Sequence, residues 1–341
     1  MAQGICFRTK GNHNQGMGDV MGSLAIADEL RRRGYSVVFL IDNDIEAAAA
    51  IRKMGFTFFT AAEFSTEEEA WISIHYDAVV VNQLSTPVER LSIIKRHCDV
   101  LVTLDDTGEA SRKLADLRIN PLYYDKGAYC DPCYVPLHTV FMEAHNKTKY
   151  IHETVRNLLV TLGGSDTYGL TPQIIGALST HGVDIQITVV VGPAFAHHCE
   201  LEKALLNSKR EFSLQHAVDI GTLCYLIQKA DLAICAAGNT LFEMACCGTP
   251  VAVICGEPFE EETAYRLEKL GFGIVMPFNT TVDQELLQKV LGKLEPLEIR
   301  QSQSRRGKEL IDGKGIERIA DMIESILRSE QNIKATLHQL I

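Results

Sequence analysis

The chain has 341 residues, of which 46% are hydrophobic and 23% are charged, a composition typical of a globular protein large enough for two domains. Its formal net charge at pH 7 is −11, and no basic stripe is present to neutralise phosphates, which argues against nucleic acid as a partner. No apolar run approaches the roughly 18 residues of a membrane-spanning helix and no signal peptide is recognisable, so we expect a cytoplasmic protein without stable membrane insertion.

The amino-terminal segment predicts a strand, a polar loop and a helix. Ile5 to Phe7 has the apolar pattern of a strand core, and residues 8–17 form a polar loop rich in Gly and Asn. Apolar residues at helical spacing then predict a helix from Gly18 to Arg33. Asp19 opens this helix, where it is either a capping residue or a carboxylate at the mouth of an α/β crevice. Position alone leaves both interpretations open.

Strand and helix patterns alternate along most of the chain. They run from residue 1 to about 147 and again from about 156 to 278, with a polar joint at 145–149, and helical, charged segments follow. This alternation predicts an α/β protein with two Rossmann-like domains, residues 1–147 and 148–341. The oligomeric state stays open.

A glycine-rich loop follows the first strand of the second domain. Leu158 to Leu162 is an apolar, β-branched run, and Gly163 and Gly164 allow the backbone to approach a ligand closely. Ser165 adds a hydroxyl group. Asp166 either caps the next helix or contacts ligand hydroxyls.

The stretch from Asp231 to Pro250 predicts a buried strand, a turn of small residues at 236–238, a helix capped by Asn239 or Thr240, and a second buried strand. The amides of the turn would lie at the carboxyl edge of a parallel sheet and at the positive end of a helix, which is an anion site. Glu243 follows one helical turn later and can accept two hydrogen bonds from a vicinal diol such as a ribose. This pattern indicates a nucleotide site. The alternative is an ordinary strand–turn–helix joint with a solvated Glu243.

Neither the acidic residues nor the cysteines indicate a metal site. Asp105 and Asp106 are contiguous, which is typical of a turn at a strand end rather than of a spaced metal-binding pair. Most of the ten cysteines lie in apolar segments, and the single pair Cys130 and Cys133 has no second pair at zinc-site spacing. We expect reduced thiols, no metal and no cofactor.

Seven short motifs occur in one order along nearly the whole chain: Phe7-Arg8, Gln15 to Val20, Leu104 to Asp106, Asp116 to Asn120, Tyr134 to Leu137, Leu162 to Asp166, and Ala237 to Glu243. That order resembles the UDP-sugar hydrolases of the pseudaminic acid pathway and the related spore-coat polysaccharide (SpsG-type) proteins. The carboxyl half also looks like the donor domain of the family 28 glycosyltransferases that build peptidoglycan lipid intermediates. The resemblance implies the GT-B architecture, in which two Rossmann-like domains face each other across a cleft and the terminal helix packs back on the first domain.

The resemblance also implies roles for individual residues. Glu243 would hold the ribose of a bound UDP-sugar, and the backbone at 220–223 would support the uracil. Arg8 is the candidate cation for the departing diphosphate, and Gly16 and Gly18 belong to the amino-terminal substrate loop. The diphosphate would be held by the two glycine-containing loops, through Gly163, Gly164, Ser165, Gly238, Asn239 and Thr240.

Two departures from the hydrolase pattern leave the reaction open. The hydrolases carry a histidine, the proposed base, where this chain has Asp19, and they carry an Asp-x-Tyr element where it has residues 82–84, Asn-Gln-Leu. Gly18-Asp19-Val20 looks instead like the motif of antibiotic-type inverting glycosyltransferases, in which that aspartate is the proposed base. We expect cleavage of the anomeric C1–O bond with inversion, in surface polysaccharide or nonulosonic sugar biosynthesis, by a hydrolase. The alternatives are an inverting glycosyltransferase and a catalytically silent nucleotide-sugar-binding protein.

Overall fold

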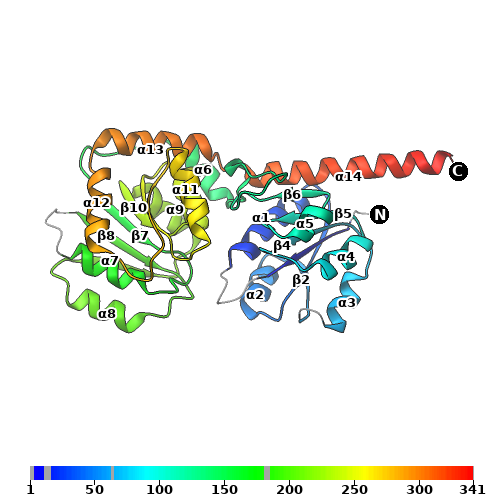
Figure 1. Cartoon of the computed structure of the whole chain (residues 1–341), viewed down its shortest axis with the longest axis horizontal. Helices are drawn as coiled ribbons and strands as arrows, with labels where there is room; N and C mark the ends of the chain where they lie inside the picture. Colours follow the sequence, from blue (N-terminus) through cyan, green and yellow to red (C-terminus); the bar gives the residue numbers. More distant parts are fainter. Residues whose placement is uncertain (1–3, 11–16, 63–64, 180–184, 341) are drawn as a thin grey trace. The chain divides into compact units, whose positions relative to one another are not determined.

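A computed structural model describes residues 4–10, 17–62, 65–179 and 185–340 (Figure 1). The chain forms two compact units: unit 1 comprises residues 1–136 and 314–341, and unit 2 comprises residues 137–313. The division lies nearer the amino terminus than the expected joint at 147, because helix α6 (Thr139–His145) packs on helices of unit 2. Residues 314–341 return to unit 1.

Unit 1 is built on a six-stranded, fully parallel sheet with the order β3-β2-β1-β4-β5-β6. This is the strand order of a doubly wound Rossmann sheet, as the alternating pattern predicts. The strands are β1 (Gly4–Thr9), β2 (Ser36–Ile41), β3 (Thr57–Thr60), β4 (Tyr76–Asn82), β5 (Cys98–Leu104) and β6 (Leu117–Ile119). The helices are α1 (Gly18–Arg32), α2 (Ile45–Lys53), α3 (Thr66–Ile72), α4 (Val88–Arg96), α5 (Glu109–Leu114) and α14 (Gly315–Leu340), with a short 3-10 helix at Pro132–Tyr134.

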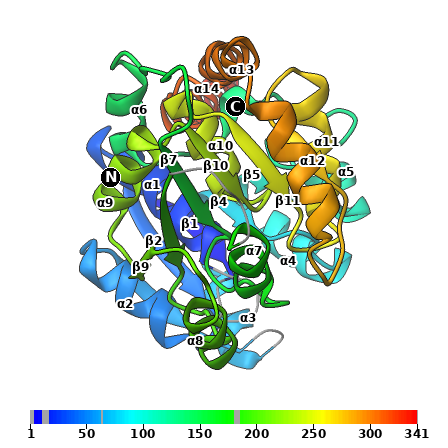
Figure 2. The same ribbon diagram turned by 90° about the vertical axis from the view of Figure 1, so that its left-hand side faces the viewer.

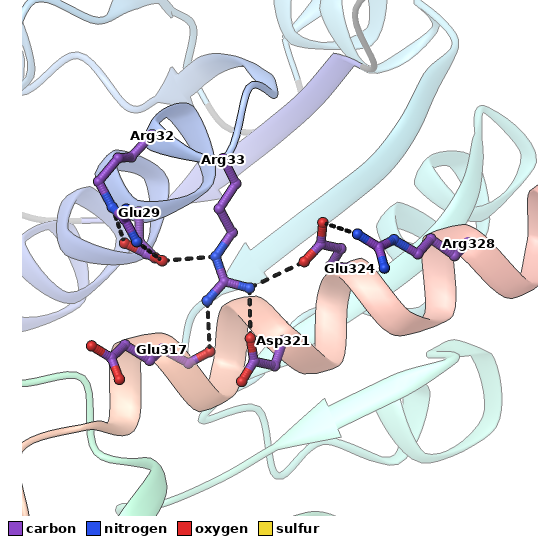
Figure 3. Close-up of polar contacts among 7 residues, drawn as sticks. All are labelled: Glu29, Arg32, Arg33, Glu317, Asp321, Glu324 and Arg328. Atoms are coloured by element: carbon purple, nitrogen blue, oxygen red, sulfur yellow. Dashed lines mark hydrogen bonds and ion pairs between the residues drawn. The ribbon is translucent and has the colours of Figure 1, made fainter.

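The terminal helix α14 belongs to the core of unit 1. Its residues Ile319, Ile323 and Leu327 are buried with the strands of this sheet and with α1, because they recur at helical spacing on one face. A polar clamp reinforces this packing (Figure 3). The Arg33 guanidinium donates to Asp321 at 2.6 Å and to Glu324 at 3.2 Å, both on α14. The last turn of α1 is thereby tied to α14.

Unit 2 repeats the same topology. Its parallel sheet has the order β12-β11-β10-β7-β8-β9, and helices frame its central strands (Figure 2). Apolar residues of α7 and α12 pack on one face of the sheet, and α10 packs with α6, α9 and α13. The strands are β7 (Asn157–Thr161), β8 (Gln186–Val191), β9 (Phe212–His216), β10 (Leu232–Cys235), β11 (Val251–Ile254) and β12 (Ile274–Met276). The remaining helices are α7 (Leu170–Leu178), α8 (His198–Leu206), α9 (Ile220–Lys229), α10 (Asn239–Cys247), α11 (Glu260–Lys269), α12 (Gln284–Leu294) and α13 (Leu297–Leu310).

Each sheet reverses its winding direction at one pair of strands. In unit 1 the reversal falls between β1 and β4, and in unit 2 it falls between β7 and β10. In open α/β sheets, ligands bind beyond the carboxyl ends of the strands at such a switch point, because the two flanking loops diverge there to opposite faces of the sheet. We therefore expect ligand-binding residues on the loops after β1, β4, β7 and β10.

Candidate functional site

The two glycine-containing loops of unit 2 begin side by side. Thr161, the last residue of β7, pairs in register with Cys235, the last residue of β10. The segment from Gly163 to Ser165 follows the first strand, and the turn at 236–238 follows the second. The structure thus places both predicted loops at the switch point of this sheet.

The loop after β7 presents open backbone. A Cβ atom at Gly163 or Gly164 would meet no heavy atom of the described chain within 4 Å, and Gly163 has φ +80°, which favours glycine. On its other side the loop lies against Gly192, where an added Cβ would lie 2.4 Å from the Gly164 carbonyl oxygen. The outward side is therefore accessible to a ligand, while the inward side is held by close backbone packing.

Asp166 serves the helix that follows this loop. Its two carboxylate oxygens accept hydrogen bonds from the backbone N–H groups of Leu170 and Thr171, each at 2.8 Å. Asp166 is buried and adopts φ +45°. Of the two roles considered for this residue, the structure shows the cap on α7, and the Ser165 hydroxyl remains the polar side chain of the loop.

The turn after β10 leaves the start of α10 without a side-chain cap. The expectation that Asn239 or Thr240 caps this helix is wrong, because both residues lie inside its first turn and Gly238 is the N-cap. Glycine has no side chain with which to accept a helix-terminal N–H. The first N–H groups of α10 and the positive end of its dipole are thus suited to an external acceptor.

Glu243 is buried on α10, one turn into the helix. Its side chain is 9% exposed, and its Oε2 atom has no hydrogen-bond partner among the described residues. Burial, and to a lesser degree the nearby Cys224 thiol, raise the pKa of Glu243 to about 8. A solvated Glu243 is therefore excluded. A buried carboxyl oxygen without a partner is costly, and a ligand hydroxyl can satisfy it.

Glu260 also reaches the turn after β10. Its Oε2 atom accepts the Gly256 N–H at 2.7 Å, and its carboxylate also accepts the N–H of Ala237. Its Oε1 atom lies 3.5 Å from the position that a Cβ of Gly238 would occupy. Burial raises the pKa of Glu260, and these backbone hydrogen bonds oppose that rise. The residue lies 24 positions after Ala236 in the sequence, so no local motif indicates the contact.

In unit 1, Asp19 lies in the first turn of α1 beside the switch point. Its side chain is half-buried, and burial raises its pKa to about 6. The N-cap of this helix is Met17, without a side-chain cap. Asn82, at the end of β4, donates its amide N–H groups to the Asp19 carbonyl oxygen at 3.0 Å and to Ser23 Oγ at 3.1 Å. The asparagine that departs from the hydrolase pattern thus anchors the turn that carries Asp19.

Arg8 does not occupy the place expected of it. Its side chain is 1% exposed, its Nε donates to Glu68 at 2.9 Å, and it also pairs with Asp42. Strand β1 extends to Thr9, so Arg8 is a strand residue rather than the first residue of the loop. The positive charge of Arg8 is thus paired with carboxylates of unit 1. Gly18 is exposed at the start of α1, and Gly16 lies outside the described residues.

Asp105 is a further carboxyl group near Asp19. It follows β5 with φ +50°, is 8% exposed, and accepts the Leu122 N–H at 3.1 Å. Burial chiefly, and the negative charge of Asp19 secondarily, raise its pKa to about 8. The predicted strand-end turn is present, but burial of the carboxyl group is a tertiary effect. Two consecutive acidic residues after an apolar strand were the one local signal.

Among the residues that the structure describes, no group of three or more His, Cys, Asp or Glu residues has the arrangement of a metal site. Among the same residues, no helix is both long and apolar enough to cross a bilayer. The Cys130 thiol donates to the Asp125 carbonyl oxygen at 3.2 Å.

Comparison with known proteins adds distant relatives and a clear fold. No protein family profile matches the chain. The spore coat polysaccharide biosynthesis protein SpsG of Bacillus subtilis is 25% identical over 337 residues, covering 94% of this chain and 97% of SpsG. Protein MJ1062 of Methanocaldococcus jannaschii is also 25% identical, over 76% of this chain, but the match spans only 57% of that protein.

The structural similarity extends over almost the entire chain. MurG of Acinetobacter baumannii superposes with a TM-score of 0.70 and 13% identity, covering 95% of this chain and 99% of MurG. The calicheamicin glycosyltransferase CalG4 superposes with a TM-score of 0.62 and 16% identity, covering 96% of this chain and 98% of CalG4. MnaA of S. aureus, solved with UDP, superposes with a TM-score of 0.65 and 13% identity, covering 96% of this chain and 97% of MnaA. The protein therefore has the GT-B architecture, with the two Rossmann-like units expected from the sequence.

Proposed function

We propose that this protein is a nucleotide-sugar enzyme that binds a UDP-sugar on unit 2 and cleaves its anomeric C1–O bond with inversion. The observation that carries the proposal is Glu243, a buried carboxyl group whose Oε2 atom has no partner among the described residues, on the helix that starts at the switch point of unit 2. A ligand hydroxyl can donate to this oxygen, and a vicinal diol can donate to both oxygens of one carboxylate.

The surroundings of Glu243 suit the rest of a nucleotide. The open backbone of Gly163 and Gly164 and the uncapped start of α10 offer amide donors to a diphosphate. The structural similarity to MnaA, which was solved with UDP, supports this choice of ligand. A pyrimidine nucleoside diphosphate is the ligand class that we propose.

Asp19 is the proposed base. Displacement at an anomeric carbon passes through an oxocarbenium-like state, so a nucleophile must lose its proton while the diphosphate departs from the opposite face. Partial burial brings the pKa of Asp19 to about 6, so the carboxylate is ionised at neutral pH yet more basic than an ordinary aspartate. Because Arg8 is buried and ion-paired, the departing diphosphate is stabilised in this proposal by helix-terminal amides.

The nucleophile distinguishes two candidate reactions. The GT-B fold shared with glycosyltransferases, together with similarity to a polysaccharide biosynthesis protein, favours an inverting glycosyltransferase in surface polysaccharide biosynthesis. The order of motifs along the chain favours hydrolysis of a UDP-sugar, in a pathway to nonulosonic sugars. A carboxylate base at position 19 can activate either a sugar hydroxyl or water.

Product analysis separates these reactions. The protein is incubated with a panel of UDP-sugars in H₂¹⁸O, with and without candidate sugar acceptors, and the products are identified by mass spectrometry. A hydrolase releases a free sugar carrying ¹⁸O at C1 without an acceptor, whereas a transferase forms a glycoside and needs one. Release of UDP under neither condition, for any sugar of the panel, would contradict the enzymatic proposal and favour a silent binding protein.

A further inference from the structure

The proposed diphosphate position in unit 2 already holds a carboxyl group from the chain itself. Glu260, the first residue of α11, accepts N–H groups from two different loops: that of Gly256, at 2.7 Å, from the loop after β11, and that of Ala237 from the turn after β10. Its other carboxylate oxygen lies 3.5 Å from the Cβ position of Gly238. The carboxylate thus lies on the amide-lined turn at the start of α10.

One part of this arrangement belongs to ordinary helix capping. Glu260 accepts N–H groups of Gly256 and Glu257, four and three residues before the start of α11, and carboxylates are favourable in the first turn of a helix. The contact with Ala237 is different, because Ala237 belongs to another βα connection and capping of α11 does not require it. A carboxylate and a phosphate compete for the same amide donors.

A second, independent feature marks this turn as a ligand site. Glu243, on the same helix α10, is nine-tenths buried and keeps an oxygen without a partner among the described residues. Of the two carboxyl groups Glu243 and Glu260, only Glu260 accepts backbone N–H groups, that of Ala237 in this turn and that of Gly256 in the loop after β11. Glu243 is left for a neutral donor such as a hydroxyl group.

We propose that Glu260 competes with the diphosphate, and that its carboxylate must release the Ala237 N–H of the β10–α10 turn before a nucleotide sugar binds there. This inference rests on the proposed function, since it assumes a diphosphate on that turn. The competition would make the site specific for nucleotide sugars over simple anions. A ligand needs favourable contacts from its nucleoside and sugar parts to displace Glu260, so an anion without these parts is bound weakly. The affinity for a nucleoside, which lacks phosphates, is independent of Glu260.

The test compares three ligands, UDP, uridine and inorganic pyrophosphate, by calorimetric titration of the full-length protein. Glu260→Gln keeps the size of the side chain and removes its charge. Glu262→Gln is the matched control, because it removes one charge from an exposed position in the same first turn of α11. We expect Glu260→Gln to bind UDP about 10-fold more tightly, since a charge-assisted competitor is lost. Pyrophosphate binding should strengthen as well, whereas uridine affinity should change by less than about twofold.

Each outcome decides the proposal. Unchanged or weaker UDP binding in a folded Glu260→Gln variant, with wild-type affinity intact, overturns the competition while leaving the proposed function standing. If the Glu262→Gln control also bound UDP more tightly, the gain in affinity would come from the change in net charge, and the proposed competition by Glu260 would be overturned. If no variant binds UDP, both the inference and the proposed function fail. Near-UV circular dichroism checks folding, and Glu260→Ala serves as the second variant, with the same expected gain in UDP affinity.

Discussion

Glu243 should destabilise the protein in proportion to its ionisation, and Glu243→Gln should remove that effect. The carboxyl group is 9% exposed and its pKa is about 8, against an ordinary value of 4.5. Because the pKa of Glu243 is raised in the folded state, its contribution to the free energy of unfolding is fully present below pH 4.5 and is lost as the pH rises through 8. At about 1.4 kcal/mol per pH unit, this loss of stability amounts to at most about 5 kcal/mol above pH 8, and to about 3 kcal/mol at pH 7.

Urea unfolding of the wild type and of Glu243→Gln at pH 5, 7 and 9 measures this difference. We expect the two proteins to have similar free energies of unfolding at pH 5, apart from a constant offset, and the variant to gain several kcal/mol relative to the wild type by pH 9. Glu262→Gln, which removes an exposed charge of the same kind, should run parallel to the wild type. If the Glu243→Gln and wild-type stabilities also stayed parallel from pH 5 to 9, the buried, unpartnered state of this carboxyl group would be refuted.

Three further predictions concern unit 1. Asp19→Asn should not lower the melting temperature at pH 7, because Met17 rather than Asp19 is the N-cap of α1 and the burial that raises the pKa of Asp19 to about 6 disfavours its charged form. Turnover of the UDP-sugar should fall roughly 10²–10⁴-fold, and full activity in this variant would end the role of Asp19 as base. In the wild type the rate should rise as the pH increases through about 6, where Asp19 loses its proton. Arg8→Met should lower the free energy of unfolding by about 3 kcal/mol, since it breaks a buried ion pair, and should leave UDP affinity unchanged; a loss of affinity without a loss of stability would restore Arg8 to the ligand site.

The features predicted correctly from sequence are local ones. The strands that precede Gly163 and Gly238 are short apolar runs bounded by small residues, so the pattern shows both the strand and the loop that follows it. The alternation of these units along the chain predicts parallel sheets, and the parallel arrangement then brings loops to one edge. Burial of Glu243 was not predicted, because the sequence left open a ligand contact or a solvated side chain, whereas residues 240–247 of α10 are all buried in the structure.

The features that sequence reasoning missed depend on partners far along the chain. Arg8 looks like a loop cation until Glu68, 60 residues later, is seen to accept its hydrogen bond. Asp105 looks like a turn residue, and its raised pKa depends on burial and on Asp19. Glu260 reaches a turn that precedes it by more than 20 residues, and no local motif indicates this contact. One sequence carries no distance information of this kind.

The central claim is that unit 2 binds a uridine nucleotide through Glu243, and a calorimetric titration with UDP tests it most directly. The wild type should bind UDP, and Glu243→Ala should lose about 1.5–3 kcal/mol of binding free energy, or roughly 10- to 150-fold in affinity, because a charge-assisted contact with the ribose is removed. The measurement is best made above pH 8, where the pKa of about 8 leaves Glu243 ionised in the free protein. Equal affinities of the two proteins, or no binding of UDP by the wild type, would contradict the account.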